Sequence, residues 1–242
     1  MLYFFLDNNI SKWGLIGDWF YKAGYEAIPA VLGYASIFLY VMIGYLLGSL
    51  NSAVIVSKVM FKDDIRKYGS GNAGFTNMMR TFGTKAAAIT FAGDILKAVF
   101  AVLIAWLLRG YIAGFIAGLA CFFGHLYPCF CQFKGGKGVL STAAMMLVLD
   151  VRIFVGLVAV FLLGAFITKY ISFGSILAAM IFPLLTSRLN VTGLSIVVVI
   201  SFIMAAMVVF KHRKNLVRIF NGTESKFSFK KSKDKADGAK NG

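Results

Sequence analysis

The chain has 242 residues, of which 59% are hydrophobic and only 14% are charged. That is too little polar surface to coat a water-soluble globule of this length, so a soluble fold is excluded and the bilayer is the expected solvent. The formal net charge of +15 comes from basic residues beside apolar segments, which indicates binding to anionic lipid headgroups and not to nucleic acid.

Residues 1–27 combine aromatic residues such as Trp13, Trp19 and Tyr25 with charged ones. Such a mixture is typical of a segment at the level of the lipid headgroups, so we expect an N-terminal interfacial extension here. The extension lacks the basic start, compact apolar stretch and cleavage site of a removable signal peptide. A transmembrane domain is expected to follow over residues 28–225.

The transmembrane domain contains seven apolar segments separated by polar breaks. Their lengths suit helices and they lack the alternation of barrel strands, so the predicted fold class is an all-α, polytopic helical bundle of about seven spans. The segments are 31–57, 86–108, 111–128, 139–149, 153–168, 173–187 and 192–210. The fourth is shorter than the ~20 residues that cross a hydrocarbon core, which predicts a half-helix or a helix joined to its neighbour at Asp150 and Arg152.

Lys and Arg are distributed unequally between the two sides of the predicted bundle. If the N-terminus is outside, nineteen of them lie on the inner side and five on the outer side. Because inner loops of membrane proteins carry the excess of basic residues, we expect the C-terminus in the cytoplasm and an odd number of spans. Residues 226–242 are Lys-rich and almost free of apolar side chains, which predicts a disordered basic cytoplasmic tail.

Polar residues are concentrated in three short stretches, which we name island one (residues 58–85), island two (125–142) and island three (211–231). Each combines Gly or Asn with Lys, Arg or His, the residue types that hold phosphate at a membrane edge. In the predicted topology all three face the cytoplasm. The sequence therefore favours a multi-pass enzyme of the cell membrane that acts on phosphorylated substrates from the cytoplasmic side.

Island one has Gly69, Gly71 and Gly74 in the spacing of a dinucleotide-binding loop, with Asp94 at the customary offset. No strand precedes these glycines and Asp94 falls within a predicted membrane helix, so we reject that motif. Glycines still let backbone N–H groups approach an anion, and an arginine adds a cation. The predicted phosphate ligands are Gly69, Ser70, Gly71, Asn72, Thr76, Asn77 and Arg80. A Gly/Asn turn with helix-capping residues is the structural alternative.

Island two places His125 ahead of the run Gly135-Gly136-Lys137-Gly138. The run matches a nucleotide P-loop only in part, because Gly138 stands where that loop has a magnesium-binding Ser or Thr. Glycines, a lysine and a following helix start can form a phosphate cradle from N–H groups, the positive helix end and an ammonium group. A flexible interfacial turn with a snorkelling lysine is the alternative. The three nearby cysteines lack the partners of a zinc site and are expected to pack as small apolar residues.

Island three begins with His212, Arg213 and Asn215, where the last predicted span leaves the bilayer. Basic clusters at such exits are common anchoring features, and this alternative stays open. The chain's only two histidines, His125 and His212, are nevertheless both expected at the same membrane face, which favours contact with substrate.

Asp94 and Lys97 lie three residues apart on one face of the second predicted span. Isolated charges within the bilayer are costly, so we expect a structural ion pair beneath the site or a polar cavity. Glu224, beyond the start of island three, is expected to pair with a basic loop.

The islands, in this order, resemble the bacterial acyl-phosphate:glycerol-3-phosphate acyltransferases over about residues 44–226. The resemblance rests on Gly48-Ser49, Arg66 with Gly69-Ser70-Gly71-Asn72 through Arg80, Asp94 with Lys97, Gly124-His125 with Pro128, Gly135-Gly136-Lys137-Gly138-Val139, and His212-Arg213 with Asn215. The chain departs from the family pattern at Asn51, Ala53, Phe75 and Leu140-Ser141.

The resemblance implies transfer of a fatty acyl group from acyl phosphate to the 1-hydroxyl of glycerol 3-phosphate, giving lysophosphatidic acid and phosphate in the first acylation of phospholipid synthesis. It implies no cofactor, no metal, and neither acyl-CoA nor acyl-carrier protein as donor. It assigns phosphate binding to Ser70, Arg80 and Lys137, and the glycerol-phosphate site to the loop of Gly135, Gly136 and Gly138. It also implies that His125, His212 and Asn215 assist the reaction or orient substrate, and that Glu224 is structural. The oligomeric state stays open.

Two other classes of membrane protein fit parts of the pattern. A transporter or channel for an anionic metabolite could use the same basic, Gly-rich sites. A CDP-alcohol phosphotransferase would need an Asp-rich metal cluster, which Asp63-Asp64 alone does not supply. The sequence does not choose between the histidines as general base, since a substrate phosphate could also take the proton.

Overall fold

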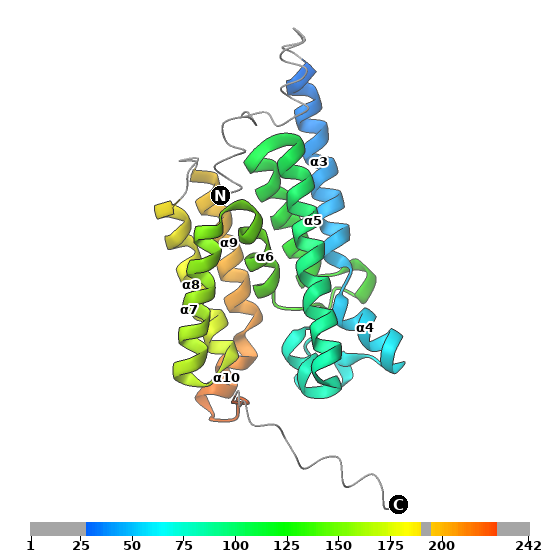
Figure 1. The fold of residues 1–242 in the computed structure, drawn as a ribbon, viewed down its shortest axis with the longest axis vertical. Coiled ribbons are helices and arrows are strands. Elements are labelled where there is room, and N and C mark those ends of the chain that lie inside the picture. The colour runs from blue at the N-terminus through cyan, green and yellow to red at the C-terminus, as the bar shows by residue number, and fades with distance from the viewer. Residues whose placement is uncertain (1–27, 190–194, 227–242) are drawn as a thin grey trace, which may run out of the picture.

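A computed structural model describes residues 28–189 and 195–226, and the secondary structure of these residues is entirely helical (Figure 1). This confirms the predicted all-α fold class. The predicted interfacial extension over residues 1–27, and the predicted basic tail from residue 227 on, lie outside the described residues.

The first predicted span, residues 31–57, is not one continuous helix. Helix α3 (Ile28–Ser49) ends at Ser49, and α4 (Ser52–Phe61) begins after a two-residue break. Asn51 causes the break, because its side chain accepts a hydrogen bond of 3.0 Å from Val54 N and so caps a new helix. The apolar residues on both sides of Asn51 gave no sign of this cap in the sequence. Helix α4, which it starts, runs into island one.

Helix α5 (Phe75–Leu126) contains non-helical residues at Gly83, Arg109 and Gly110, so it comprises three helical pieces. Gly110 has a φ of 80°, a left-handed conformation that suits glycine and reverses the chain. The long pieces on either side pack closely against each other. This is seen at Gly114, where an added Cβ would lie against Trp106 and Val102. The predicted boundary between residues 108 and 111 is therefore confirmed.

Close backbone contact fixes α3 against this α5 hairpin. A Cβ at Gly48 would overlap the backbone of Cys121, and a Cβ at Gly124 would overlap the backbone of Tyr45. Small residues are what membrane helices use to approach one another this closely. The contact brings the end of α3 beside His125, in the second island.

The C-terminal half consists of α6 (Val139–Leu149), α7 (Val151–Thr168), α8 (Ile171–Leu189), α9 (Ser195–Lys211) and α10 (Arg213–Phe220). The short α6 is joined to α7 at Asp150, as predicted. Asp150 ends α6 and caps α7 by accepting from Arg152 N at 3.0 Å. Eleven residues of helix rise only about 16 Å, roughly half of a hydrocarbon core.

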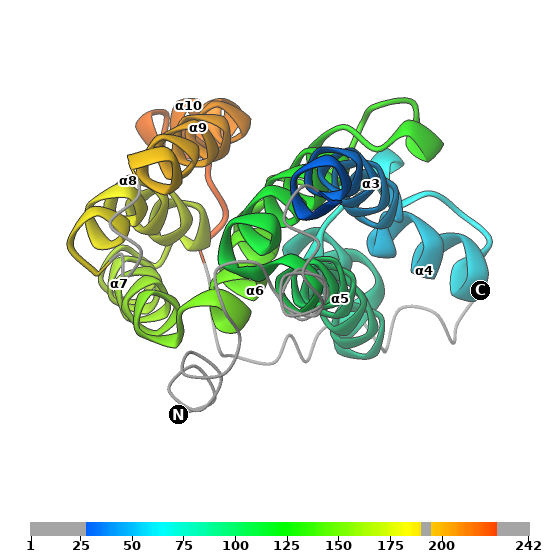
Figure 2. The ribbon, with the colours of Figure 1, turned by 90° about the horizontal axis from the view of Figure 1, so that it is seen from above.

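Seen from above, α7, α8 and α9 lie on one side, α3, α4 and α5 on the other, and α6 between them (Figure 2). A core of buried side chains joins the two groups; its largest members include Phe115, Phe122, Met145, Met146, Leu149, Phe182 and Met204. Within the described residues, four helical stretches are long and apolar enough to cross a membrane when α5 is counted once despite its reversal at Gly110, and the bent α9–α10 pair would make a fifth.

Candidate active site

The three polar islands, far apart in the sequence, meet at one end of the bundle. Arg66 of island one donates from Nη1 to the carbonyl of Cys131 in island two at 2.8 Å. Lys137 of island two donates from Nζ to Oδ1 of Asn215 in island three. These two contacts join all three islands, which is what a shared phosphate site requires.

The loop of island one is braced from inside by Asn77. Its Oδ1 accepts from Ser70 N at 3.1 Å, and its Nδ2 donates to the carbonyl of Tyr68 at 2.9 Å. Gly69 and Gly71 both have positive φ, 56° and 70°, which lets the loop fold back over the buried Asn77 amide. The structure thus gives Asn77 a loop-bracing role, while its predicted contact with substrate stays a prediction.

Other predicted ligands of island one lie on the open side of the same loop. Ser70 and Arg80 are exposed, and Asn72 and Thr76 are half-buried. Arg80 donates from Nη2 to the carbonyl of Ser225 at 3.4 Å, which ties island one to the chain beyond α10. Thr76 lies in the first turn of α5, where backbone N–H groups have no partner within the helix. This open side can therefore present several donors to an anion.

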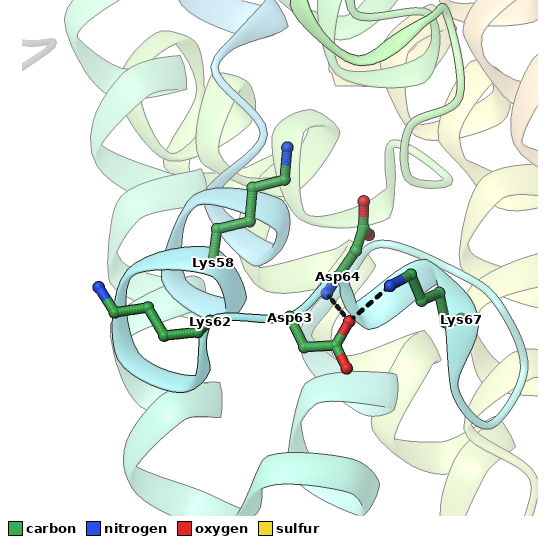
Figure 3. A pocket seen from close by; sticks show the side chains of 5 residues that line it. All are labelled: Lys58, Lys62, Asp63, Asp64 and Lys67. Carbon is green, nitrogen blue, oxygen red and sulfur yellow. Dashed lines mark hydrogen bonds and ion pairs between the residues drawn. The ribbon is translucent and has the colours of Figure 1, made fainter.

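An open depression of about 420 Å³ lies at the start of island one and is lined by Lys58, Lys62, Asp63, Asp64 and Lys67 (Figure 3). Both of its carboxylates are occupied by cations of the same loop. Asp63 accepts from Tyr68 and from Lys67, and these bonds lower its pKa to about 2. Asp64 pairs with Arg66 at 2.7 Å. Across residues 28–189 and 195–226, no group of three His, Cys, Asp or Glu could hold a metal ion, so the cluster of a CDP-alcohol phosphotransferase is not assembled there.

His125 lies on a buried charge cluster beneath island two. Asp94 and Lys97 form an ion pair of 2.8 Å, which confirms the predicted pairing. Lys97 Nζ also donates to the carbonyl of Leu50 at 2.9 Å and lies 3.1 Å from Nδ1 of His125. The same Nδ1 lies 3.6 Å from Oδ1 of Asp94, so both members of the ion pair contact this side of the ring. His125 is thereby held by the charges below it.

The Gly-rich loop lies directly on His125. Gly136 N donates to the carbonyl of His125 at 3.1 Å, and a Cβ at Gly135 would overlap that same carbonyl. Gly138 has a φ of 83° and leads into α6, which begins at Val139. This confirms the predicted helix start after the lysine. Gly135 leaves no room for a side chain, and Gly138 has a backbone conformation that favours glycine.

We predict that Gly136→Ala lowers kcat/KM by about 100-fold, the cost of displacing catalytic groups by about an ångström. A Cβ there would overlap three atoms of the His125 imidazole, so ring and loop must separate and carry Lys137 with them. Steady-state kinetics in detergent would measure the loss. Gly156→Ala on α7 is the control, because its Cβ would meet only the end of the Leu185 side chain. Equal activity of the two variants would contradict the expectation.

Lys137 is held by a hydrogen-bonded chain that reaches α8 and α10. Asn215 accepts from Lys137 and donates from Nδ2 to Oε1 of Glu224 at 2.6 Å. Glu224 also accepts from Ser172 at 2.8 Å and from Arg218 at 2.6 Å. Burial alone would raise the pKa of Glu224, but the bonds from Arg218, Asn215 and Ser172 outweigh it and lower that pKa. Glu224 thus stays a carboxylate and fixes which way the Asn215 amide points.

His212 lies at the bend between α9 and α10 and is buried. Its Nδ1 lies 2.8 Å from the carbonyl of Val208, and a carbonyl only accepts, so the neutral ring carries its proton on Nδ1. Nε2 is then the nitrogen with the lone pair. His212 therefore has a ring nitrogen that can accept a proton, whereas Nδ1 of His125 lies against Lys97.

Several residues of the site carried no readable signal in the sequence. Ser172 looks like an ordinary polar residue of an apolar helix, yet it bonds Glu224. Arg218 is one of many basic residues near the C-terminus, and its pairing with Glu224 crosses the end of α10. The Leu50 carbonyl that accepts from Lys97 is exposed only because α3 breaks there. A search for the Asn51 cap would have found this break.

The family model described as glycerol-3-phosphate acyltransferase matches residues 38–222. A glycerol-3-phosphate acyltransferase of Thermoanaerobacter pseudethanolicus is 42% identical over 190 residues, covering 78% of this chain and 94% of that protein. The corresponding Bacillus subtilis protein is 38% identical, covering 78% and 97%. The crystal structure of PlsY (YgiH), an integral membrane glycerol 3-phosphate acyltransferase in its glycerol 3-phosphate form, superposes with a TM-score of 0.74 at 30% identity, covering 80% of this chain and 96% of that one. With its three islands assembled at one end of a matching helical bundle, this chain belongs to the glycerol-3-phosphate acyltransferase family.

Proposed function

We propose that this protein transfers a fatty acyl group from acyl phosphate to the 1-hydroxyl of glycerol 3-phosphate, giving lysophosphatidic acid and phosphate. The observation that carries the proposal is the Lys137–Asn215 contact, which joins the Gly-rich loop to island three. The solved PlsY structures in a glycerol 3-phosphate form and a lysophosphatidic acid form support the acceptor and the product.

An acyl phosphate is a mixed anhydride whose phosphate leaves readily, so the reaction needs alignment more than activation. The glycerol hydroxyl oxygen attacks the carbonyl carbon, the bond from that carbon to the phosphate oxygen breaks, and the hydroxyl proton passes to a base. Lys137 and Arg80 offset the repulsion between two phosphate groups, and Ser70 with the N–H group of Gly69 adds donors. The Gly71 N–H, by contrast, already donates to the Tyr68 carbonyl at 2.9 Å. His212 Nε2 is our candidate for the base, and Asn215 holds Lys137 in place.

The position of the site relative to the membrane follows from charge. Nineteen of the 25 Lys and Arg residues are on the side of the three islands in the predicted topology. We therefore assign the site to the cytoplasmic face of the cell membrane, where a soluble glycerol phosphate is available. Within that assignment residues 28–225 form the acyltransferase domain, with the interfacial extension before it and the basic tail after it.

The fall of kcat/KM at alkaline pH should follow the loss of the proton from Lys137. Burial lowers the pKa of Lys137 to about 8, so its ammonium charge is present below that pH and is lost as the pH rises through it. We expect kcat/KM to fall by about tenfold per unit above the pKa, since that ratio follows the free enzyme. In Lys137→Arg this fall should disappear from this range, because a guanidinium stays charged. Initial rates corrected for spontaneous acyl phosphate hydrolysis measure this, and an unchanged fall in the variant would contradict the assignment.

The direct test incubates the purified chain with labelled glycerol 3-phosphate and palmitoyl phosphate, with palmitoyl-CoA as the contrasting donor. We expect labelled lysophosphatidic acid from palmitoyl phosphate only. An anion transporter would instead take up labelled glycerol 3-phosphate into sealed vesicles without any acyl donor. Product formed equally well from palmitoyl-CoA would overturn the proposed donor, and uptake without product would overturn the proposed reaction.

A further inference from the structure

Helix α10 presents an open face that the proposed reaction does not use. It follows α9 after a bend of 51° and lies at the lower end of the bundle in Figure 1. Arg213, Val217 and Phe220 fall on one side of this helix at spacings of three and four residues. Val217 is 58% exposed and Phe220 is 87% exposed. Apolar side chains at the end of a membrane helix are therefore left uncovered beside a cation.

The opposite face of α10 belongs to the site. Asn215 is buried there and bonds both Lys137 and Glu224. Arg218 bonds Glu224 from the flank of the helix. Any ligand that fixes the position of α10 from its open face will consequently also fix Asn215 against Lys137.

A depression of about 500 Å³ on the open side is lined by Arg213, Lys214, Val217 and Arg218. Three of these four residues are cations and none is acidic. Arg213 also lies over the ring of Phe210, 4.3 Å from its centroid, and donates to the Phe210 carbonyl at 3.1 Å. This holds the guanidinium where the last apolar helix ends, at the depth where lipid phosphates lie.

The depression beside island one differs in one decisive respect. Its lining lysines share the surface with Asp63 and Asp64, whose carboxylates repel an anion (Figure 3). In the α10 depression Arg218 is paired with Glu224, but no lining residue is acidic, and the cations Arg213 and Lys214 lie beside the exposed apolar residues Val217 and Phe220. That combination complements an anionic amphiphile, which presents a phosphate beside acyl chains.

We propose that the open face of α10 binds the headgroup of an anionic membrane phospholipid, with Arg213 and Lys214 on the phosphate and Val217 and Phe220 against the acyl chains. The bound lipid holds α10 in place and thereby keeps Asn215 on Lys137. The protein is consequently more active in a membrane that contains anionic lipid. Only this second step, the effect on turnover, rests on the proposed function.

The test uses the full chain in nanodiscs of phosphatidylcholine with and without a minor fraction of phosphatidylglycerol. Retention of each lipid is measured by native mass spectrometry, and acyl transfer is measured in the same discs. The variant Arg213→Gln/Lys214→Gln removes two cations from α10, and Lys58→Gln/Lys62→Gln removes two from the island-one depression. We expect the α10 variant to lose about 30-fold in affinity for phosphatidylglycerol and to lose its stimulation, while keeping the rate seen in phosphatidylcholine alone. The Lys58/Lys62 variant should keep both.

The possible failures are distinguishable. Equal loss of phosphatidylglycerol in both variants, or no loss in either, overturns the α10 site. Selective lipid loss with no change in turnover overturns the link between α10 and Asn215. Selective lipid binding by a protein that makes no lysophosphatidic acid in any disc supports the lipid site and overturns the proposed reaction instead. A thermal melt of the α10 variant, expected to match the wild type, separates lost binding from lost folding.

Discussion

Lys137→Gln is expected to lower kcat/KM about 1,000-fold, since removing one preorganised donor at a developing charge costs 100- to 1,000-fold and here a full cation is removed. The ammonium group is half-buried and fixed by Asn215, so it reaches the phosphate already oriented. Arg80→Gln should give a loss of at least 100-fold for the same reason, although Arg80 is exposed and more weakly held. Initial rates with both substrates varied would measure each loss.

Lys134→Gln is the matched control for Lys137. It removes a lysine three residues earlier in the same loop whose side chain is exposed. We expect its kcat/KM to stay within about twofold of the wild type, as for an exposed charge that solvent screens. If Lys134→Gln and Lys137→Gln lose activity equally, activity depends on the total positive charge of the loop. The specific role proposed for Lys137 is then contradicted.

The second large effect is on stability. Asp94→Asn should lower the free energy of unfolding by about 3 to 5 kcal/mol, because it leaves the Lys97 ammonium uncompensated in a buried site. The side chains of Lys97 and Asp94 are only 5% and 3% exposed, and Lys97 also holds the Leu50 carbonyl and the His125 ring. Thermal unfolding in a fixed detergent, followed by tryptophan fluorescence, would report the change as a lowered Tm.

The double variant Asp94→Asn/Lys97→Met tests the cause. Removing both charges together should recover most of the lost stability, since a well-packed neutral pair often matches a buried ion pair. Lys67→Gln breaks an exposed pair with Asp63 and should leave the Tm unchanged. A double variant that is less stable than Asp94→Asn alone would show that Lys97 acts through its bonds to Leu50 and His125 and not through the charge pair.

The helical class and the positions of most helices could be read from the sequence because lipid imposes them. A bilayer requires internal satisfaction of every backbone polar group, so apolar runs become helices almost regardless of their neighbours. The predicted segments 139–149 and 153–168 match α6 and α7 within two residues, and the reversal at Gly110 lies where two runs were separated. The prediction of one continuous helix over residues 31–57 was wrong, because the capping residue Asn51 starts a new helix within the apolar run.

The sequence predicted which residues belong to the candidate site, but not how they are arranged in space. Gly, Lys and His are chemically distinctive, so Gly136, Lys137 and His125 stood out in an oily sequence. The roles of Asn77 and Glu224 depend on which atoms lie within hydrogen-bond reach. Asn77 turns inward to brace its own loop, and Glu224 reaches Ser172, 52 residues away in the chain. Contacts between such distant residues leave no local pattern in a sequence.

The sequence by itself determined that this protein lies in a membrane as a helical bundle, and that its polar chemistry is confined to three islands, because hydropathy and charge act residue by residue. Only the tertiary structure decided that these islands share one site. The glycine contacts of α3 with α5 bring His125 beside the broken end of α3, and the bend after α9 carries Asn215 to Lys137. Such distances are set by how the helices pack, and packing is a property of the whole chain.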